Sequence, residues 1–275
     1  MSDSIPTAFD ARLGRRALLR NSLLALGAGA VLAACGDREG SVDPGRLGVA
    51  PPLPTLPEVG TVSDATWLRT LQSLEHTMLS VYAGIADHGG LPGQGAALTE
   101  PFTAAHTAAA DTLAGLVADA DGADFACPNP FFADRYVTPV LDALADSDDA
   151  ERDLRNIAYA FEDWTARSYQ AASVRSWADP SVRATLIGLA AEASRRAGGL
   201  AFAYSPDTLL SPVLTGGQAE VDADGFATMY AIPARFGQVS PIELRYGMAN
   251  ADGARATLSL QTPADNSLLY DSVSC

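Results

Sequence analysis

The sequence predicts a mainly α-helical protein with a small β module near its C-terminal end. Four stretches repeat apolar residues with the 3.6-residue period of an amphipathic helix, and from about residue 216 the pattern changes to a two-residue alternation. The connections within the first and second pairs of helices are short, whereas about thirty residues separate the two pairs. Two helical hairpins joined by one long crossover form a four-helix bundle, which is the fold that we expect.

Each predicted helix has an apolar stripe, and two of them have clear start signals. Ser63 is an expected N-cap for the first helix. Asp179 precedes Pro180, which suits the first helical position of the fourth helix. The four helices are expected over about 63–87, 99–118, 149–176 and 179–204.

The C-terminal part is expected to contain a β-hairpin. Apolar residues alternate over 242–248 and again over 256–260, and a turn signal lies between them at 250–253. Further strands are predicted over 226–232 and 268–273. A β module of this size is marginally stable alone, so we expect it to pack on the bundle.

The N-terminal segment has the pattern of an export signal. The apolar run from Ser22 to Ala33 is too short to cross a hydrocarbon core, which needs about 20 residues, but it fits the apolar region of a signal peptide. Arg15-Arg16 before this run resembles a twin-arginine (Tat) signal. The run ends in Leu32-Ala33-Ala34-Cys35-Gly36, which resembles the bacterial lipobox.

The lipobox resemblance implies that Cys35 carries lipid and becomes the first residue of the mature protein. We therefore expect a protein that is lipid-anchored on the extracytoplasmic face of the cell membrane. The following proline-rich segment favours extended conformations, which suits a tether. The predicted domains are a signal peptide over 1–34, the lipidated cysteine and tether over 35–62, a bundle over 63–204, and a linker with the β module over 205–275.

The acidic composition excludes nucleic acid as an expected partner. The formal net charge is −15, and the signal peptide carries two more positive than negative charges, so the mature chain is near −17. Binding to phosphate backbones needs a basic surface. The same charge disfavours electrostatic attachment to anionic lipid, so the lipid anchor must hold the protein at the membrane. The sequence leaves open whether the protein forms a homo-oligomer or binds another envelope protein.

Two cysteines remain after Cys35 is assigned to lipid. Cys127 lies in the long crossover and Cys275 is the last residue. An even pair in an oxidising compartment predicts a disulfide. The alternative is two free thiols.

Each predicted helix carries a carboxylate or an imidazole on or beside its apolar stripe. These residues are informative because burying an unpaired charge is costly. The residues are Leu71-x-x-Leu74-Glu75 before Tyr82, Phe161-Glu162 before Tyr169, His106 in the second helix and Glu192 in the fourth. Their pattern resembles the ferritin-like superfamily, whose four helices hold two iron or manganese ions with four carboxylates and two histidines.

Two positions depart from the family pattern. Thr103 stands where the second helix should supply a glutamate, and Arg195 stands where the fourth should supply a histidine. Of the six ligands of the family, four remain: Glu75, His106, Glu162 and Glu192. The resemblance then implies at most one Fe or Mn ion, surrounded by Glu75, His106 and Glu192. We expect Arg195 to replace the second metal by pairing its guanidinium with Glu162 and Glu192, the two carboxylates of the second metal position.

Two alternatives to a metal site stay open. In one, the polar residues form a metal-free hydrogen-bonded network inside the bundle. In the other, Glu162, Glu192 and Arg195 lie on the solvated face, with the last two as a surface pair.

The expected function follows from the anchor and the altered site. It is an anchored ferritin-like lipoprotein with a degenerate site for one Fe or Mn ion, and no cofactor at all is equally compatible. Enzyme activity is uncertain, and an active di-iron oxidase is disfavoured. The alternative is a metal-free structural or interaction protein of the cell envelope.

Overall fold

The computed structural model describes residues 62–211, 226, 228–231, 242–264 and 266–275. Leu53–Cys275 form one compact unit, and all of the described residues belong to it. The predictions for the signal peptide, Cys35 and most of the tether concern residues that lie outside the described ones. Among the described helices, none is long and apolar enough to cross a membrane.

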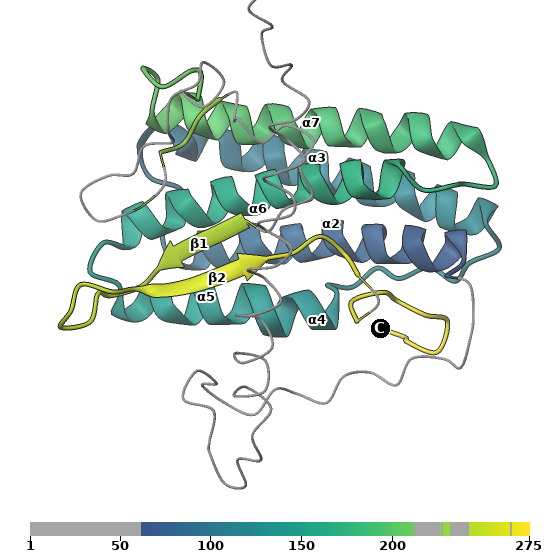
Figure 1. The fold of residues 1–275 in the computed structure, drawn as a ribbon, viewed down its shortest axis with the longest axis horizontal. Coiled ribbons are helices and arrows are strands. Elements are labelled where there is room, and N and C mark those ends of the chain that lie inside the picture. The colour runs from purple at the N-terminus through teal and green to yellow at the C-terminus, as the bar shows by residue number, and fades with distance from the viewer. Residues whose placement is uncertain (1–61, 212–225, 227, 232–241, 265) are drawn as a thin grey trace, which may run out of the picture. The chain divides into compact units, whose positions relative to one another are not determined.

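The described part is mainly helical, as the sequence predicts, with four long helices lying side by side (Figure 1). The first two and the last two pack most closely as pairs, and each pair also contacts the other. Their bounds lie within a few residues of the predicted ones. The helices are α2 (Asp64–Asp87), α3 (Ala96–Asp119), α6 (Ala150–Ser173) and α7 (Pro180–Tyr204).

The predicted start signals act as helix caps. Ser63 Oγ accepts a hydrogen bond from the backbone N–H of Thr66 at 3.1 Å and so caps α2. Asp179 Oδ1 accepts from the backbone N–H of Ser181 at 2.8 Å, and Pro180 occupies the first position of α7.

The long crossover contains a helical segment that the sequence analysis missed. Asn129 caps it by accepting from the backbone N–H of Phe131 at 3.0 Å. Apolar side chains four residues apart face the core, among them Phe132, Tyr136 and Val140. The segment consists of α4 (Pro130–Phe132), a π-helical turn (Ala133–Val137), α5 (Thr138–Asp142) and a 3₁₀ turn (Ala143–Asp146).

The aromatic centre of the core joins this crossover to α6 and the β module. Trp164 of α6 is fully buried, and its ring meets that of Phe132 edge-on at 4.8 Å between centroids. Its indole N–H donates to the carbonyl of Gln261 at 2.7 Å, so the polar end of the ring is also satisfied.

The predicted hairpin is present. Strands β1 (Ile242–Tyr246) and β2 (Ala256–Leu260) are antiparallel, and Ile242 lies opposite Leu260. The hairpin packs on α6, where Asp153 accepts a hydrogen bond from the backbone N–H of Gly247 at 2.7 Å. Met248, which the alternation placed in the first strand, lies beyond its end and is 62% exposed.

The predicted strand over 268–273 is wrong, because α2 side chains satisfy this backbone instead of a neighbouring strand. The N–H of Leu269 donates to Thr70 Oγ1 at 2.9 Å, and Arg69 Nη2 donates to the carbonyl of Val273 at 2.7 Å. The prediction over 226–232 falls partly outside the described residues.

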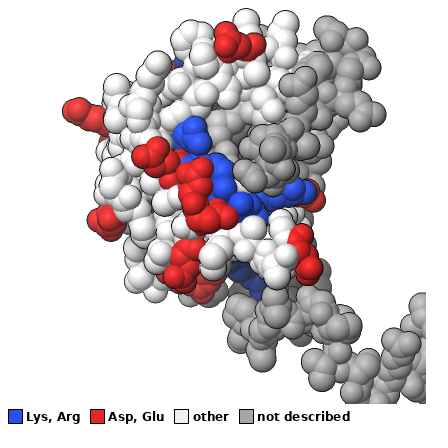
Figure 2. Space-filling view, turned by 90° about the vertical axis from the view of Figure 1, so that its left-hand side faces the viewer, with Lys and Arg blue, Asp and Glu red and all other residues white. Residues whose placement is uncertain are grey.

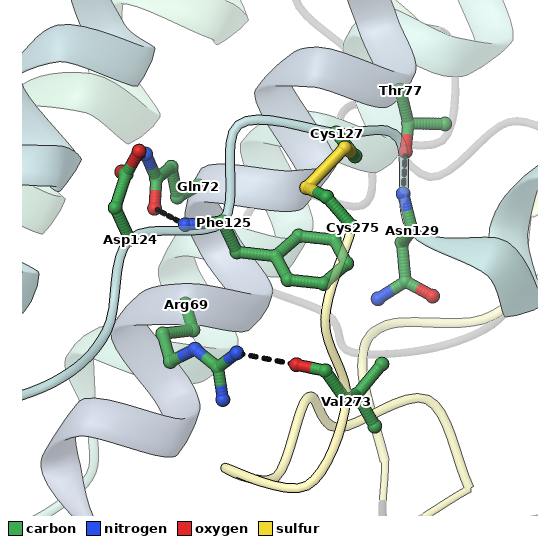
Figure 3. Close-up of a disulfide and its surroundings, with 9 residues drawn as sticks. All are labelled: Arg69, Gln72, Thr77, Asp124, Phe125, Cys127, Asn129, Val273 and Cys275. Atoms are coloured by element: carbon green, nitrogen blue, oxygen red, sulfur yellow. Dashed lines mark hydrogen bonds between the residues drawn. A yellow bond between two sulfur atoms is a disulfide. The ribbon is translucent and has the colours of Figure 1, made fainter.

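The predicted disulfide joins Cys127 to Cys275, with 5.8 Å between their Cα atoms (Figure 3). Next to it, α2 also holds the start of the crossover. Gln72 Oε1 accepts from the backbone N–H of Phe125 at 3.1 Å, and Thr77 Oγ1 accepts from that of Asn129 at 2.9 Å. Crossover and C-terminal tail are therefore fixed to the same helix.

Some surface charges on the described residues form ion pairs. On the end of the molecule seen in Figure 2, basic side chains gather in one group with acidic side chains beside it. Asp148 accepts from Arg152 at 2.8 Å and from Arg255 at 2.7 Å. Hydrogen bonds from Arg255 and Arg152 hold the pKa of the Asp148 carboxyl below its usual value.

Candidate functional site: a buried ion cluster

Six polar side chains meet in the interior between the four long helices, and we call them the interior cluster. All four helices contribute at least one member. The five members from α2, α3 and α6 are between 0% and 2% exposed, and the member from α7 is 8% exposed. The members are Glu75 and Tyr82 from α2, His106 from α3, Glu162 and Tyr169 from α6, and Arg196 from α7.

The imidazole of His106 bridges the two carboxylates of the cluster. Its Nδ1 lies 2.5 Å from Glu75 Oε2, and its Nε2 lies 3.0 Å from Glu162 Oε1. A neutral imidazole carries one N–H donor, whereas two ionised carboxylates offer acceptors only. The arrangement is therefore satisfied by the doubly protonated imidazolium.

Electrostatics favour the charged form of His106. Burial alone would lower its pKa, but the charges of Glu162 and Glu75 and the hydrogen bonds to them outweigh burial and raise the pKa to about 9. Burial would raise the pKa of Glu162, yet His106, Arg196 and Tyr82 together lower it below its usual value. Both groups are therefore ionised at neutral pH.

Arg196 completes the charge balance. Its Nε donates to Glu162 Oε2 at 2.8 Å. Burial would lower the pKa of Arg196, but the carboxylates of Glu162 and Glu75 outweigh burial and raise it. The cluster thus contains two carboxylates and two cations and is neutral overall, which reduces the cost of burying its charges.

The cluster repeats itself across the two hairpins. Glu75 and Tyr82 are separated by seven residues, and so are Glu162 and Tyr169. Each tyrosine donates to the glutamate of the other helix: Tyr82 to Glu162 Oε1 at 2.8 Å, and Tyr169 to Glu75 Oε1. Every carboxylate oxygen consequently accepts at least one hydrogen bond, with His106 and Arg196 supplying the rest.

The expected role of Arg195 is wrong, because its neighbour Arg196 reaches the interior instead. Arg195 is 69% exposed in its side chain and donates to Glu192 Oε1 at 2.7 Å, as an i,i+3 pair on the surface. This is the solvated pairing that one alternative predicted for these two residues. For Glu162, which is fully buried, the same alternative is wrong.

Glu192 does not join the interior cluster. Its side chain is 56% exposed, so it does not bridge Glu75 and His106 as the family pattern implied. The three other expected ligands, Glu75, His106 and Glu162, do lie together.

The interior residues do not fit a bound metal ion in this arrangement. A histidine ligand must offer an unprotonated ring nitrogen, and both nitrogens of His106 are engaged with carboxylates. The other carboxylate oxygen of Glu162, Oε2, accepts a hydrogen bond from Arg196. Within the described residues, no three carboxylate, histidine or cysteine side chains are placed to hold one ion.

Arg196 was missed although the sequence contains a signal for it. It is three residues after Ala193 and four before Leu200, both fully buried, so it continues the buried stripe of α7. The family spacing instead pointed to Arg195, which stands where the fourth helix should supply a histidine. The tyrosines were used only as family markers, and their hydrogen bonds across the cluster were not foreseen.

Comparisons of the chain with family models, with curated proteins and with solved structures found no match.

Proposed function

We propose that this chain is a lipid-anchored extracytoplasmic protein with a ferritin-like four-helix bundle, in which a metal-free ion cluster replaces the metal centre. Its role is then that of a binding or structural module of the cell envelope rather than that of a di-iron oxidase. One observation carries the proposal: His106 bridges Glu75 and Glu162 through both ring nitrogens.

The repetition of the cluster supports the ferritin-like part of the proposal. The pairs Glu75–Tyr82 and Glu162–Tyr169 occupy equivalent places on the first helix of each hairpin. His106 and a second cation, Arg196, come from the second helix of each hairpin. In the ferritin-like arrangement all four helices supply metal ligands. Here two side-chain cations supply the positive charge that metal ions would bring.

The disulfide and the charge support the proposed location. A disulfide between Cys127 and Cys275 is typical of a protein that folds in an oxidising compartment outside the cytoplasm. The acidic chain and its paired basic side chains disfavour nucleic acid and leave lipid on Cys35 as the means of membrane attachment. These observations agree with the lipobox at 32–36.

One preparation tests both parts of the proposal. We expect the full-length protein, purified in detergent from cells grown with iron, manganese and zinc, to contain well under one equivalent of any of them by elemental mass spectrometry. Intact mass should give a chain that starts at Cys35 and carries lipid. Stoichiometric iron or manganese that is lost in His106→Ala would refute the metal-free cluster, and an unmodified Cys35 would refute the anchor.

The charged state of His106 predicts a specific pH dependence of stability. The pKa is about 9 in the folded protein, above the ordinary 6.5, so the folded state binds the proton more tightly. The resulting stabilisation is fully present below about pH 6.5 and is lost as pH rises to about 9. We expect a loss of roughly 3 kcal/mol over this range, measured by urea unfolding.

The variant His106→Gln serves as the control for this titration. It retains a polar side chain but cannot titrate, so its stability should change with pH less than that of the wild type. The difference between the two curves isolates His106 from other groups. Parallel curves would mean that His106 is not a buried imidazolium.

A further inference from the structure

A small cavity lies between α3 and α7 and reaches the interior cluster. Its volume is about 190 Å³. Small side chains of α3 form one wall, among them Ala105, Ala108 and Ala109. Glu75 and Tyr169, which belong to the interior cluster, line the same space. We call it the α3–α7 cavity.

The guanidinium of Arg196, a residue that lines this cavity, has unused hydrogen-bond donors. Arg196 lines it, and its Nε is bonded to Glu162. Its two terminal nitrogens make no hydrogen bond and no ion pair with any residue that the structure describes. A planar guanidinium with both terminal nitrogens free is suited to hold a carboxylate through two parallel hydrogen bonds.

The remaining charged groups of the cavity are carboxylates. Glu75 lines its interior, and Glu192 lines it from the exposed side. A simple anion would meet two negative charges beside Arg196, and a simple amine would meet the guanidinium. A molecule with one carboxylate and one ammonium group complements both kinds of charge.

Size and polarity restrict the ligand further. A cavity of about 150 Å³ holds benzene, so about 190 Å³ holds a molecule of roughly six to eight non-hydrogen atoms. The alanine wall and Leu189 provide apolar contact for a short aliphatic group. We propose that the α3–α7 cavity binds a small aliphatic α-amino acid, with its carboxylate on Arg196 and its ammonium group toward Glu75 and Glu192.

This inference rests on the proposed metal-free cluster, because Arg196 is a member of that cluster. It is independent of the lipid anchor. Metal content and ligand binding are measured separately, so failure of one is distinguishable from failure of the other.

Isothermal titration of the full-length protein in detergent tests the proposal. The probe is L-valine, compared with isovalerate, which lacks the ammonium group, and isobutylamine, which lacks the carboxylate. We expect L-valine to bind saturably at one site and both analogues to bind about tenfold more weakly or worse, since each loses a charge-assisted contact.

Two variants locate the site, and a third is their control. Ala105→Leu fills the cavity, and Arg196→Lys keeps the charge but loses the planar fork, so both should weaken valine binding about tenfold or more. Ala104→Leu changes an exposed residue outside the cavity lining and should bind like the wild type. Circular dichroism confirms that each variant is folded.

Three results would overturn the inference. The first is the absence of saturable valine binding to the wild type. The second is unchanged binding by folded Ala105→Leu and Arg196→Lys. The third is equal binding of isovalerate or isobutylamine, which would show that the two charges are not recognised together.

Discussion

Replacing Glu162 by glutamine is expected to lower the free energy of unfolding by about 3–5 kcal/mol. Glu162 is fully buried and accepts hydrogen bonds from His106, Arg196 and Tyr82. Glutamine has nearly the same shape but carries no charge. Two buried cations would then share the single carboxylate of Glu75, and the protein would lose its interior charge balance.

Urea unfolding of Glu162→Gln measures this cost, and Glu192→Gln is the matched control. Glu192 is 56% exposed and pairs with exposed Arg195, so its replacement should cost less than about 0.5 kcal/mol. Similar effects of the two substitutions would contradict the distinction between an interior cluster and a surface pair.

A double-mutant cycle separates the Glu162–Arg196 contact from general damage to the core. Arg196→Met removes the cation but keeps much of the side-chain volume. Because each single variant leaves a buried charge unpaired, the double variant should be less destabilised than the sum of the two, by about 1–3 kcal/mol. Strict additivity would mean that the bond at 2.8 Å contributes little.

Removing the disulfide by Cys275→Ser is expected to cost about 2–5 kcal/mol. The bond links residues 148 positions apart, so it closes a loop that includes α4 to α7 and the hairpin. In the unfolded chain a loop of this length loses much conformational entropy when it is closed. The tail should also detach more easily from α2, although Arg69 and Thr70 still bond its backbone.

Unfolding of the wild type with and without reductant checks this prediction independently. The reduced wild type, Cys275→Ser and Cys127→Ser should have similar stabilities, because each lacks the same bond. Reductant should not change either variant. If reductant leaves the wild type unchanged as well, the disulfide does not contribute to stability.

Local sequence was sufficient for the long helices and the hairpin. Ser63 and Asp179 act as caps where they were expected, since capping is an interaction between residues that are neighbours in the chain. The hairpin pairs as the alternation predicts. These elements depend on short-range periodicity and on bonds that span a few residues.

The crossover helix and the tail were not predictable in the same way. In the crossover, Pro139 follows a π-helical turn inside the helical segment, and Phe132 packs against Trp164 of α6. The tail takes its hydrogen bonds from Arg69 and other side chains of α2 instead of a neighbouring strand. Both depend on contacts between residues far apart in the sequence.

The sequence by itself placed Glu75 and His106 on the inward faces of their helices through helical periodicity, but it left open whether Glu162 is buried or solvated. Only the tertiary structure decided between Arg195 and Arg196, which point in directions about 100° apart on the same helix. The family spacing selected Arg195, and a difference of one residue along the helix exchanges a surface cation for an interior one. The choice of ion-pair and hydrogen-bond partners depends on the distances between helices. Those distances are set by the packing of the whole core.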